Sequence, residues 1–405
     1  MHHSRMLLAA LAAAAVLAGC SDQPTAPEQA SAAPAIDRAS PDRGAIHFAE
    51  AGSSVAWNQA ARDLIAARSI AAPHVQLRIL TYLSVAQYNA IVTAEDAKVA
   101  GTHASLRAAA AAASVVVLSH FFPLDASALE DDLEAQLAAP AWPGERHRDI
   151  TSGEEVGRSV GAAVVAYAQA DNFNQDPIPD PPIGPQYWRS STAPATPSVK
   201  ALWGTRPFVL ESPDQFRPDG PPDFDSDEFR TALEEIRDLS DHRTAEQLAL
   251  AQFYATRAPT YMNEIGAELI VANRRTEREA ARILALANMA GFDAMIGCWD
   301  AKFAFWLVRP WDADPGITTP IGRPNHPSYL SGHSCNTASF ATVLADAFPA
   351  ERARLEAIVV AAGLSRMYGG LHYRFDCEDG QALGRQVAEL VLAAAPVGHE
   401  PIPLD

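Results

Sequence analysis

Basic residues are scarce in this sequence, which has 31 Lys and Arg against 49 Asp and Glu in 405 residues. The resulting net charge of −18 argues against nucleic-acid binding, because such proteins neutralise phosphates with many basic side chains. Any site for an anion must therefore be built locally, from a few cations gathered within an acidic protein. The length allows two or three cores or one large helical domain.

Cysteine is rare as well, and the first of the four follows the short apolar run MLLAALAAAAVLAG. The segment Leu17–Cys20 (LAGC) resembles the lipobox of bacterial lipoproteins. The resemblance implies a signal peptide over residues 1–19, lipidation of Cys20, and export. The protein would then sit on the periplasmic side or the surface of the outer membrane, where the host has one. The alternative is an ordinary secretory signal with a chance cysteine.

Three cysteines remain: Cys298, Cys335 and Cys377. Because three is odd, at most one internal disulfide is possible, and the spacing does not assign the pair. No Cys and His spacing is typical of zinc. We therefore expect no metal-cation site.

Long apolar runs and strict two-residue alternation are both missing. Beyond the N-terminal run no apolar stretch reaches the roughly 20 residues of a membrane span. Residues 75–94 (VQLRILTYLSVAQYNAIVTA) instead place apolar side chains at three- and four-residue steps, and residues 153–170 are rich in small residues that allow close helix packing. The sequence predicts an all-α protein made of two packed four-helix-type bundles.

The composition divides the chain into four parts after the signal peptide. Residues 20–45 are rich in Pro, Ala and Ser and predict a flexible tether. An N-terminal bundle over 46–175 and a C-terminal helical domain over 226–398 are separated by a Pro-rich segment, 176–225. Its prolines exclude a continuous helix. The segment also carries five large aromatic residues, which favour a packed irregular crossing over a disordered linker: Tyr187, Trp188, Trp203, Phe208 and Phe216.

The first chemical motif is KFAFWLVRP, residues 302–310. Lys302 and Arg309 are seven residues apart, which predicts one helical face, and Pro310 predicts that the helix ends at Arg309. Their neighbours are mostly apolar. The alternative is a pair of surface cations, but cations among apolar residues favour a buried or clefted anion.

The second motif is HPSYLSGHS, residues 326–334. Ser331 and Gly332 precede a helix that we expect to begin near Ser334. Such a turn presents unpaired backbone N–H groups at the positive end of the helix dipole, and His333 follows directly. Taken alone, the motif also fits an ordinary Gly-containing turn.

The third motif is SRMYGGLHYRFD, residues 365–376. Arg366 and His372 are six residues apart, and Asp376 follows four residues later. Alone it also fits a polar loop between helices. Together the three motifs supply guanidinium, ammonium, hydroxyl and amide donors with two histidines, a set that complements a tetrahedral oxyanion of phosphate type.

This order of motifs resembles the PAP2 superfamily of type 2 phosphatidic acid phosphatases, bacterial acid phosphatases and vanadium-dependent haloperoxidases, over about residues 280–390. The resemblance implies an oxyanion-binding set: Lys302, Arg309, Ser331, Gly332 and Arg366. It implies that His372 is the axial residue, ligating vanadium or carrying the phosphoryl group. His333 would be the acid/base, and Asp376 would orient His372. Leu330 departs from the proline that usually precedes S-G-H in this family.

Two further residues favour the haloperoxidase branch. Trp299 matches a tryptophan beside the cofactor in fungal chloroperoxidases, and His326 matches a second histidine in algal bromoperoxidases. Both also fit plainer roles, as a core aromatic and a loop histidine. The resemblance implies vanadate as cofactor and oxidation of a halide by hydrogen peroxide to hypohalous acid, with Lys302 as the proton or hydrogen-bond donor to the bound peroxide.

Two other functions fit the same residues. One is a vanadate-inhibited acid phosphatase without a cofactor, which hydrolyses phosphomonoesters through a phosphohistidine at His372. The other is a non-catalytic lipoprotein that binds an oxyanion. In every case the partners are small molecules, and the membrane is contacted only through the lipid anchor.

Overall fold

The computed structural model describes residues 52–96, 98–99, 102–140, 148–173, 178–191, 197–255, 257–396 and 400–404. Regular structure there is helical apart from a two-residue antiparallel pair, β1 (Lys98–Val99) and β2 (Thr102–His103). The all-α prediction is confirmed. The predicted signal peptide, Cys20 and the tether lie outside the described residues, and they stay predictions.

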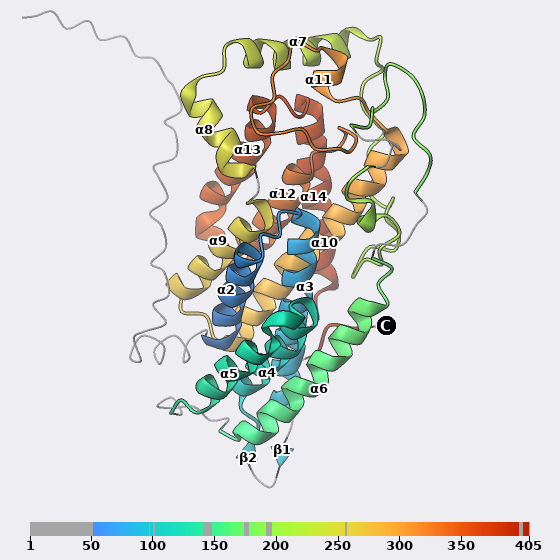
Figure 1. Ribbon diagram of the computed structural model, residues 1–405. Coiled ribbons are helices and arrows are strands. Elements are labelled where there is room, and N and C mark those ends of the chain that lie inside the picture. The colour runs from blue at the N-terminus through green and yellow to red at the C-terminus, as the bar shows by residue number, and fades with distance from the viewer. Residues whose placement is uncertain are drawn as a thin grey trace, which may run out of the picture. The chain divides into compact units, whose positions relative to one another are not determined.

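The helices follow one another along the chain as two groups on either side of the Pro-rich segment (Figure 1). The first group is α2 (Gly52–Ala67), α3 (Pro73–Asp96), α4 (Leu106–Phe121), η1 (Pro123–Asp125), α5 (Ala126–Leu137) and α6 (Ile150–Gln169). The second group is α7 (Asp227–Asp241), α8 (Ala245–Tyr254), α9 (Ala258–Ala272), α10 (Glu277–Phe305), α11 (Pro310–Ala313), α12 (Gly332–Ala347), η3 (Pro349–Glu351), α13 (Arg352–Tyr368) and α14 (Arg374–Ala394).

The long helix α10 is the centre of the fold. It packs against α3 from the first group and against α12 and α14 from the second (Figure 1). Among the described residues it is the one helix long and apolar enough to span a membrane, and 94% of its apolar window is buried inside the protein. A helix that is apolar all round and buried is a core helix. One hydrophobic cluster runs through both groups, from Leu77 of α3 to Val387 of α14.

Helix α6 packs closely against α4 through a row of glycines. Gly153, Gly157 and Gly161 lie one turn apart and face α4. A Cβ at Gly157 would lie 2.3 Å from the carbonyl oxygen of Ala109. The small residues of this segment therefore permit the close helix contact that the sequence predicts.

The Pro-rich segment is packed onto α10, as predicted. The Asp293 carboxylate of α10 accepts hydrogen bonds from the amides of Phe208 (2.8 Å), Val209 (2.7 Å) and Leu210 (3.1 Å). Arg217 donates to both oxygens of Asp300, at 2.6 and 2.8 Å. A short helix, η2 (Lys200–Leu202), is the only helical turn in the described part of this segment.

The stretch that leads into Arg309 is held by a strand-like pairing. The amide of Trp188 donates to the Trp306 carbonyl at 2.6 Å, and the amide of Val308 donates to the Gln186 carbonyl at 2.9 Å. Trp306 takes a left-handed conformation with φ 51° and ends α10. The expectation that Lys302 and Arg309 share one helical face is therefore wrong. Pairing with the Pro-rich segment ends α10 at Phe305, four residues before Arg309. Pro310 is therefore not the residue that ends this helix.

Candidate functional site

Lys302 lies in the last turn of α10 and is completely buried. Its Nζ donates to the carbonyls of Pro327 (2.9 Å), Ser328 (2.8 Å) and Leu330. Burial lowers the pKa of Lys302 to about 8. Because an ammonium has three N–H donors, all of them are used here. Lys302 thus fixes the loop before Ser331, and it can reach an oxyanion only by releasing one carbonyl.

Arg309, at the start of α11, joins two loops. Its guanidinium donates to the carbonyls of His326 (2.9 Å) and Leu371 (2.6 Å), and to ring nitrogens of His326 (3.0 Å) and His372 (3.1 Å). Burial lowers its pKa to about 9. Four of its five N–H donors are therefore engaged. The single remaining one, on Nη2, is available to a ligand.

Arg366, near the end of α13, differs from the other two cations. It is buried, with 4% of its surface exposed, and among the described residues its Nε and Nη1 find no hydrogen-bond partner. Burial lowers its pKa to about 10. A buried guanidinium without acceptors is costly. These unpaired donors mark the place where an anion fits.

The beginning of α12 lies at the same site. Ser331 is its N-cap, and the Ser331 Oγ accepts from the amide (3.4 Å) and the hydroxyl (3.1 Å) of Ser334. Gly332 begins the helix, two residues before the predicted start. Within the described part of the chain no group accepts from the Gly332 amide. A Cβ at Gly332 would lie 3.0 Å from the Trp299 ring, so glycine permits this contact.

His372 precedes α14 and is held from both sides. Its Nδ1 lies 2.8 Å from Asp376 Oδ2, and its Nε2 lies 3.1 Å from Arg309 Nη1. Because an arginine only donates, Nε2 is the acceptor and Nδ1 carries the proton. Burial, followed by the charge of Arg309, holds the pKa of His372 well below its usual range. The imidazole is neutral, with a lone pair on Nε2.

The Asp376 carboxylate accepts several hydrogen bonds. Ser328 Oγ donates to its Oδ2 at 2.5 Å and the Tyr373 amide at 3.2 Å, while Oδ1 has no partner in the described part of the chain. Burial raises its pKa to about 6. Ser328 is not among the predicted site residues, although it lies within the second motif. Its hydroxyl ties that motif to the third.

His333, the predicted acid/base, is partly exposed at the start of α12. Its Nε2 donates to the Tyr254 carbonyl at the end of α8, at 2.8 Å. The ring's Nδ1 is therefore left as the acceptor. Burial and then the charge of Arg366 hold the pKa of His333 well below its usual range. No sequence signal marked Tyr254, because it acts through its backbone.

Trp299 and His326 lie together, with ring centroids 5.1 Å apart. The Trp299 Nε1 is buried, and no described residue accepts a hydrogen bond from it. His74, from α3, interacts with His326 and is a minor cause of the lowered pKa of His326. Burial lowers the pKa of His74 to about 4, and its Nδ1 is buried and unpaired. Helix α3 thus brings to the site a histidine that the motifs did not include.

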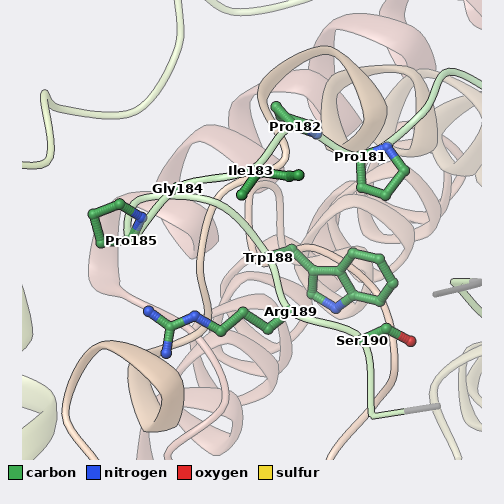
Figure 2. A pocket seen from close by; sticks show the side chains of 8 residues that line it. All are labelled: Pro181, Pro182, Ile183, Gly184, Pro185, Trp188, Arg189 and Ser190. Atoms are coloured by element: carbon green, nitrogen blue, oxygen red, sulfur yellow. The ribbon is translucent and has the colours of Figure 1, made fainter. Parts of the chain in front are cut away.

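A separate surface pocket of about 470 Å³ lies along the Pro-rich segment. Figure 2 shows the residues that line it, with the Trp188 indole and the Arg189 side chain extending in opposite directions. None of the predicted site residues lines this pocket. The candidate site is therefore the buried cluster around Arg366, and not this groove.

Residues 281–396 match the family model of the PAP2 superfamily. This part of the chain belongs to that superfamily, and it contains the three motifs. No curated protein sequence matches the chain.

Solved structures resemble a larger share of the chain. A bacterial vanadium-dependent iodoperoxidase aligns with a TM-score of 0.70 and 23% identity, over 84% of this chain and 95% of that one. A bacterial vanadium-dependent chloroperoxidase in its apo form aligns with a TM-score of 0.65 and 15% identity, over 78% and 92%. At these identities the similarity establishes the fold, which includes the helices before residue 176.

Proposed function

We propose that this chain is a vanadium-dependent haloperoxidase-like enzyme, which holds vanadate and oxidises a halide with hydrogen peroxide to hypohalous acid. The observation that carries the proposal is the buried Arg366 guanidinium with unpaired Nε and Nη1. An oxyanion at this point would accept those N–H groups together with the free Gly332 amide. It would thereby offset the cost of their burial.

Two features favour the peroxidase over the phosphatase. The Trp299 Nε1 is an additional unpaired donor beside His326, and such a donor suits a small anion next to the oxyanion. The fold is also shared, over most of the chain, with proteins described as vanadium-dependent iodoperoxidase and chloroperoxidase.

The residues of the site would divide the work. Arg366, the Ser331 hydroxyl and the Gly332 amide would donate to the oxyanion. His372 would offer the lone pair of Nε2 to the central atom, after Arg309 releases it, and Asp376 would hold the ring in that tautomer. Vanadate, when bound, supplies a Lewis-acid centre that activates peroxide without changing its own oxidation state.

Proton movement would fall to the residues at the partly exposed side. The His333 Nδ1 is the free acceptor of that ring, because Nε2 is committed to the Tyr254 carbonyl. It would accept and return a proton at this atom. Lys302 would donate a proton or a hydrogen bond at the oxyanion site once its Nζ releases one of the three carbonyls.

The test separates the two chemistries. The protein is purified without vanadate, and bromination of a reporter by peroxide is measured before and after orthovanadate is added, with a chromogenic phosphomonoester assayed in parallel. Halogenation that requires vanadate supports the proposal. Phosphomonoester turnover that vanadate abolishes, without any bromination, contradicts it.

The phosphatase remains the second candidate, since the PAP2 superfamily model matches the residues that carry the site. His372 would attack a phosphomonoester through Nε2, and His333 would protonate the leaving alcohol. A protein that only binds the oxyanion is the third. It would bind vanadate without turnover, and His372→Ala would bind equally well.

Export and lipidation at Cys20 belong to the proposal as well. They rest on the sequence Leu17–Cys20. Mass spectrometry of the mature N-terminus from the native host tests them, because a diacylglycerol on Cys20 is expected and an unmodified N-terminus contradicts it.

A further inference from the structure

Two cysteines lie on the helices that carry residues of the oxyanion site, Cys298 on α10 and Cys335 on α12. Cys298 precedes Lys302 by one turn of α10, and Cys335 follows His333 by two residues in α12. Both side chains are completely buried, and the two helices pack against each other. Neither thiol takes part in the mechanism proposed above.

The two thiols form a continuous set of contacts with the site. The Cys298 and Cys335 thiols interact with each other. The Cys298 Sγ also lies 3.7 Å from the Leu330 carbonyl oxygen, the same oxygen that accepts from Lys302 Nζ. Cys377 makes a different contact, to the Gly363 carbonyl at 3.5 Å. The structure thus distinguishes a pair from a third, separate thiol.

We propose that Cys298 and Cys335 are a disulfide-forming pair, which hydrogen peroxide oxidises, and that Cys377 is the unpaired cysteine. In the first step one thiolate attacks peroxide and gives a sulfenic acid and hydroxide. The second thiol then attacks that sulfur and releases water. Overall, two thiols and one hydrogen peroxide give one disulfide and two waters, so the sulfurs lose two electrons and the peroxide gains them.

The surroundings identify Cys298 as the first thiol to react. Burial raises the pKa of Cys298, but the interaction with Cys335 and the charge of Lys302 outweigh it, and the net pKa lies below the usual value. Burial and the interaction with Cys298 raise the pKa of Cys335 well above it. The thiolate is the nucleophile, so Cys298 attacks peroxide and Cys335 resolves the sulfenic acid.

The bond would change the site as well as the thiols. A disulfide sulfur carries no hydrogen, so Cys298 would no longer donate to the Leu330 carbonyl. The disulfide would also link the helix that carries Lys302 to the helix that begins at Gly332. We expect orthovanadate to bind about tenfold more weakly to the oxidised protein, since loss of one contact of about 1.4 kcal/mol has this effect.

The experiment maps the disulfide in the full chain. The reduced protein, free of vanadate and halide, is treated with hydrogen peroxide, the remaining thiols are blocked, and tryptic peptides are analysed without reduction. Cleavage after Lys302, Arg352 and Arg374 places the three cysteines on separate peptides. The expected product links Cys298 to Cys335 and leaves Cys377 blocked as a thiol.

Matched variants complete the test. Cys298→Ser and Cys335→Ser should each abolish the linkage, while Cys377→Ser should leave it intact. A link that includes Cys377, or three free thiols after treatment, overturns the proposal. If the reduced protein and the protein with a complete Cys298–Cys335 disulfide bind vanadate equally well, the proposed effect of the disulfide on the site is overturned. Peroxide is added as a reagent, so the mapping stands even if the enzyme proves to be a phosphatase.

Discussion

At the scale of single residues, the three buried cations of the site do three different things. Lys302 and Arg309 already have acceptors for nearly all of their N–H groups, and both hold backbone loops in place. Arg366 has none for its Nε and Nη1. The family resemblance implied the same oxyanion-binding role for all three, whereas the structure leaves donors of one of them unpaired.

This difference predicts opposite effects of two matched substitutions. Arg366→Met should weaken orthovanadate binding at least a hundredfold and leave the vanadate-free protein as stable as before, because it removes unpaired donors. Arg309→Met should cost on the order of 3 kcal/mol, because its buried acceptors lose their donor. Isothermal titration and chemical denaturation measure the two quantities. Equal loss of stability in both variants contradicts this division.

The pair of His372 and Asp376 gives a second prediction. Asp376→Asn should weaken vanadate binding by about 10- to 100-fold, the usual effect of losing a carboxylate that orients a ligating histidine. Asp379→Asn is the control, since Asp379 is on the same helix but accepts from the Tyr329 hydroxyl at 2.7 Å. Titration with orthovanadate distinguishes them. Similar affinities for the two variants would count against the orienting role.

The raised pKa of Asp376 and the lowered pKa of Lys302 predict a bell-shaped pH dependence of kcat/KM. Below pH about 6 Asp376 is protonated and holds His372 less well, so kcat/KM should fall as the pH decreases. Above pH about 8 Lys302 loses its charge, so kcat/KM should fall as the pH increases. The alkaline limb should move to higher pH in Lys302→Arg. If the alkaline limb of the kcat/KM profile has the same pKa in Lys302→Arg, a group other than Lys302 is responsible for it.

At the scale of elements, the site depends on where helices end. Helix α10 ends at Phe305 because residues 306–308 pair with residues 186–188 of the Pro-rich segment. The periodicity of KFAFWLVRP gave no sign of this, and Pro310 suggested a later end. The start of α12 was predicted within two residues, because a Ser-Gly turn is a local signal that needs no distant partner.

Asp293 tests how firmly the Pro-rich segment is attached. Asp293→Ala leaves three amides, of Phe208, Val209 and Leu210, without their acceptor. We expect a loss of about 2–4 kcal/mol in unfolding free energy and faster cleavage by thermolysin between residues 206 and 222. Asp214→Ala, at an exposed position in the same segment, is the control. Cleavage at an unchanged rate would show that other contacts suffice.

At the scale of the whole molecule, the two groups of helices share one core. Helix α10 is buried by α3 on one side and by α12 and α14 on others. A buried network also joins the groups, since Asn263 accepts from Asn58 of α2 at 2.8 Å and from Asn288 of α10 at 2.9 Å. The predicted boundary at residue 226 therefore separates segments of the sequence that pack together.

This shared core makes truncation informative. A chain that starts at residue 226 keeps every motif but exposes the apolar face of α10 that α3 covers. We expect it to bind a hydrophobic dye and to lose cooperative unfolding, while a chain that starts at residue 46 unfolds cooperatively. Calorimetry and dye fluorescence measure both. Cooperative unfolding of the shorter chain would show that the C-terminal domain is independent.

The sequence by itself determined the helical class, the packed Pro-rich crossing and the motifs of the site, because periodicity, proline content and residue spacing are local properties. Only the tertiary structure decided which cation is unpaired, which atom of His333 is free and which thiols meet. These depend on where backbone carbonyls such as those of Tyr254, Leu330 and Leu371 lie. Every residue carries the same carbonyl, so the sequence has no signal for where one will be placed.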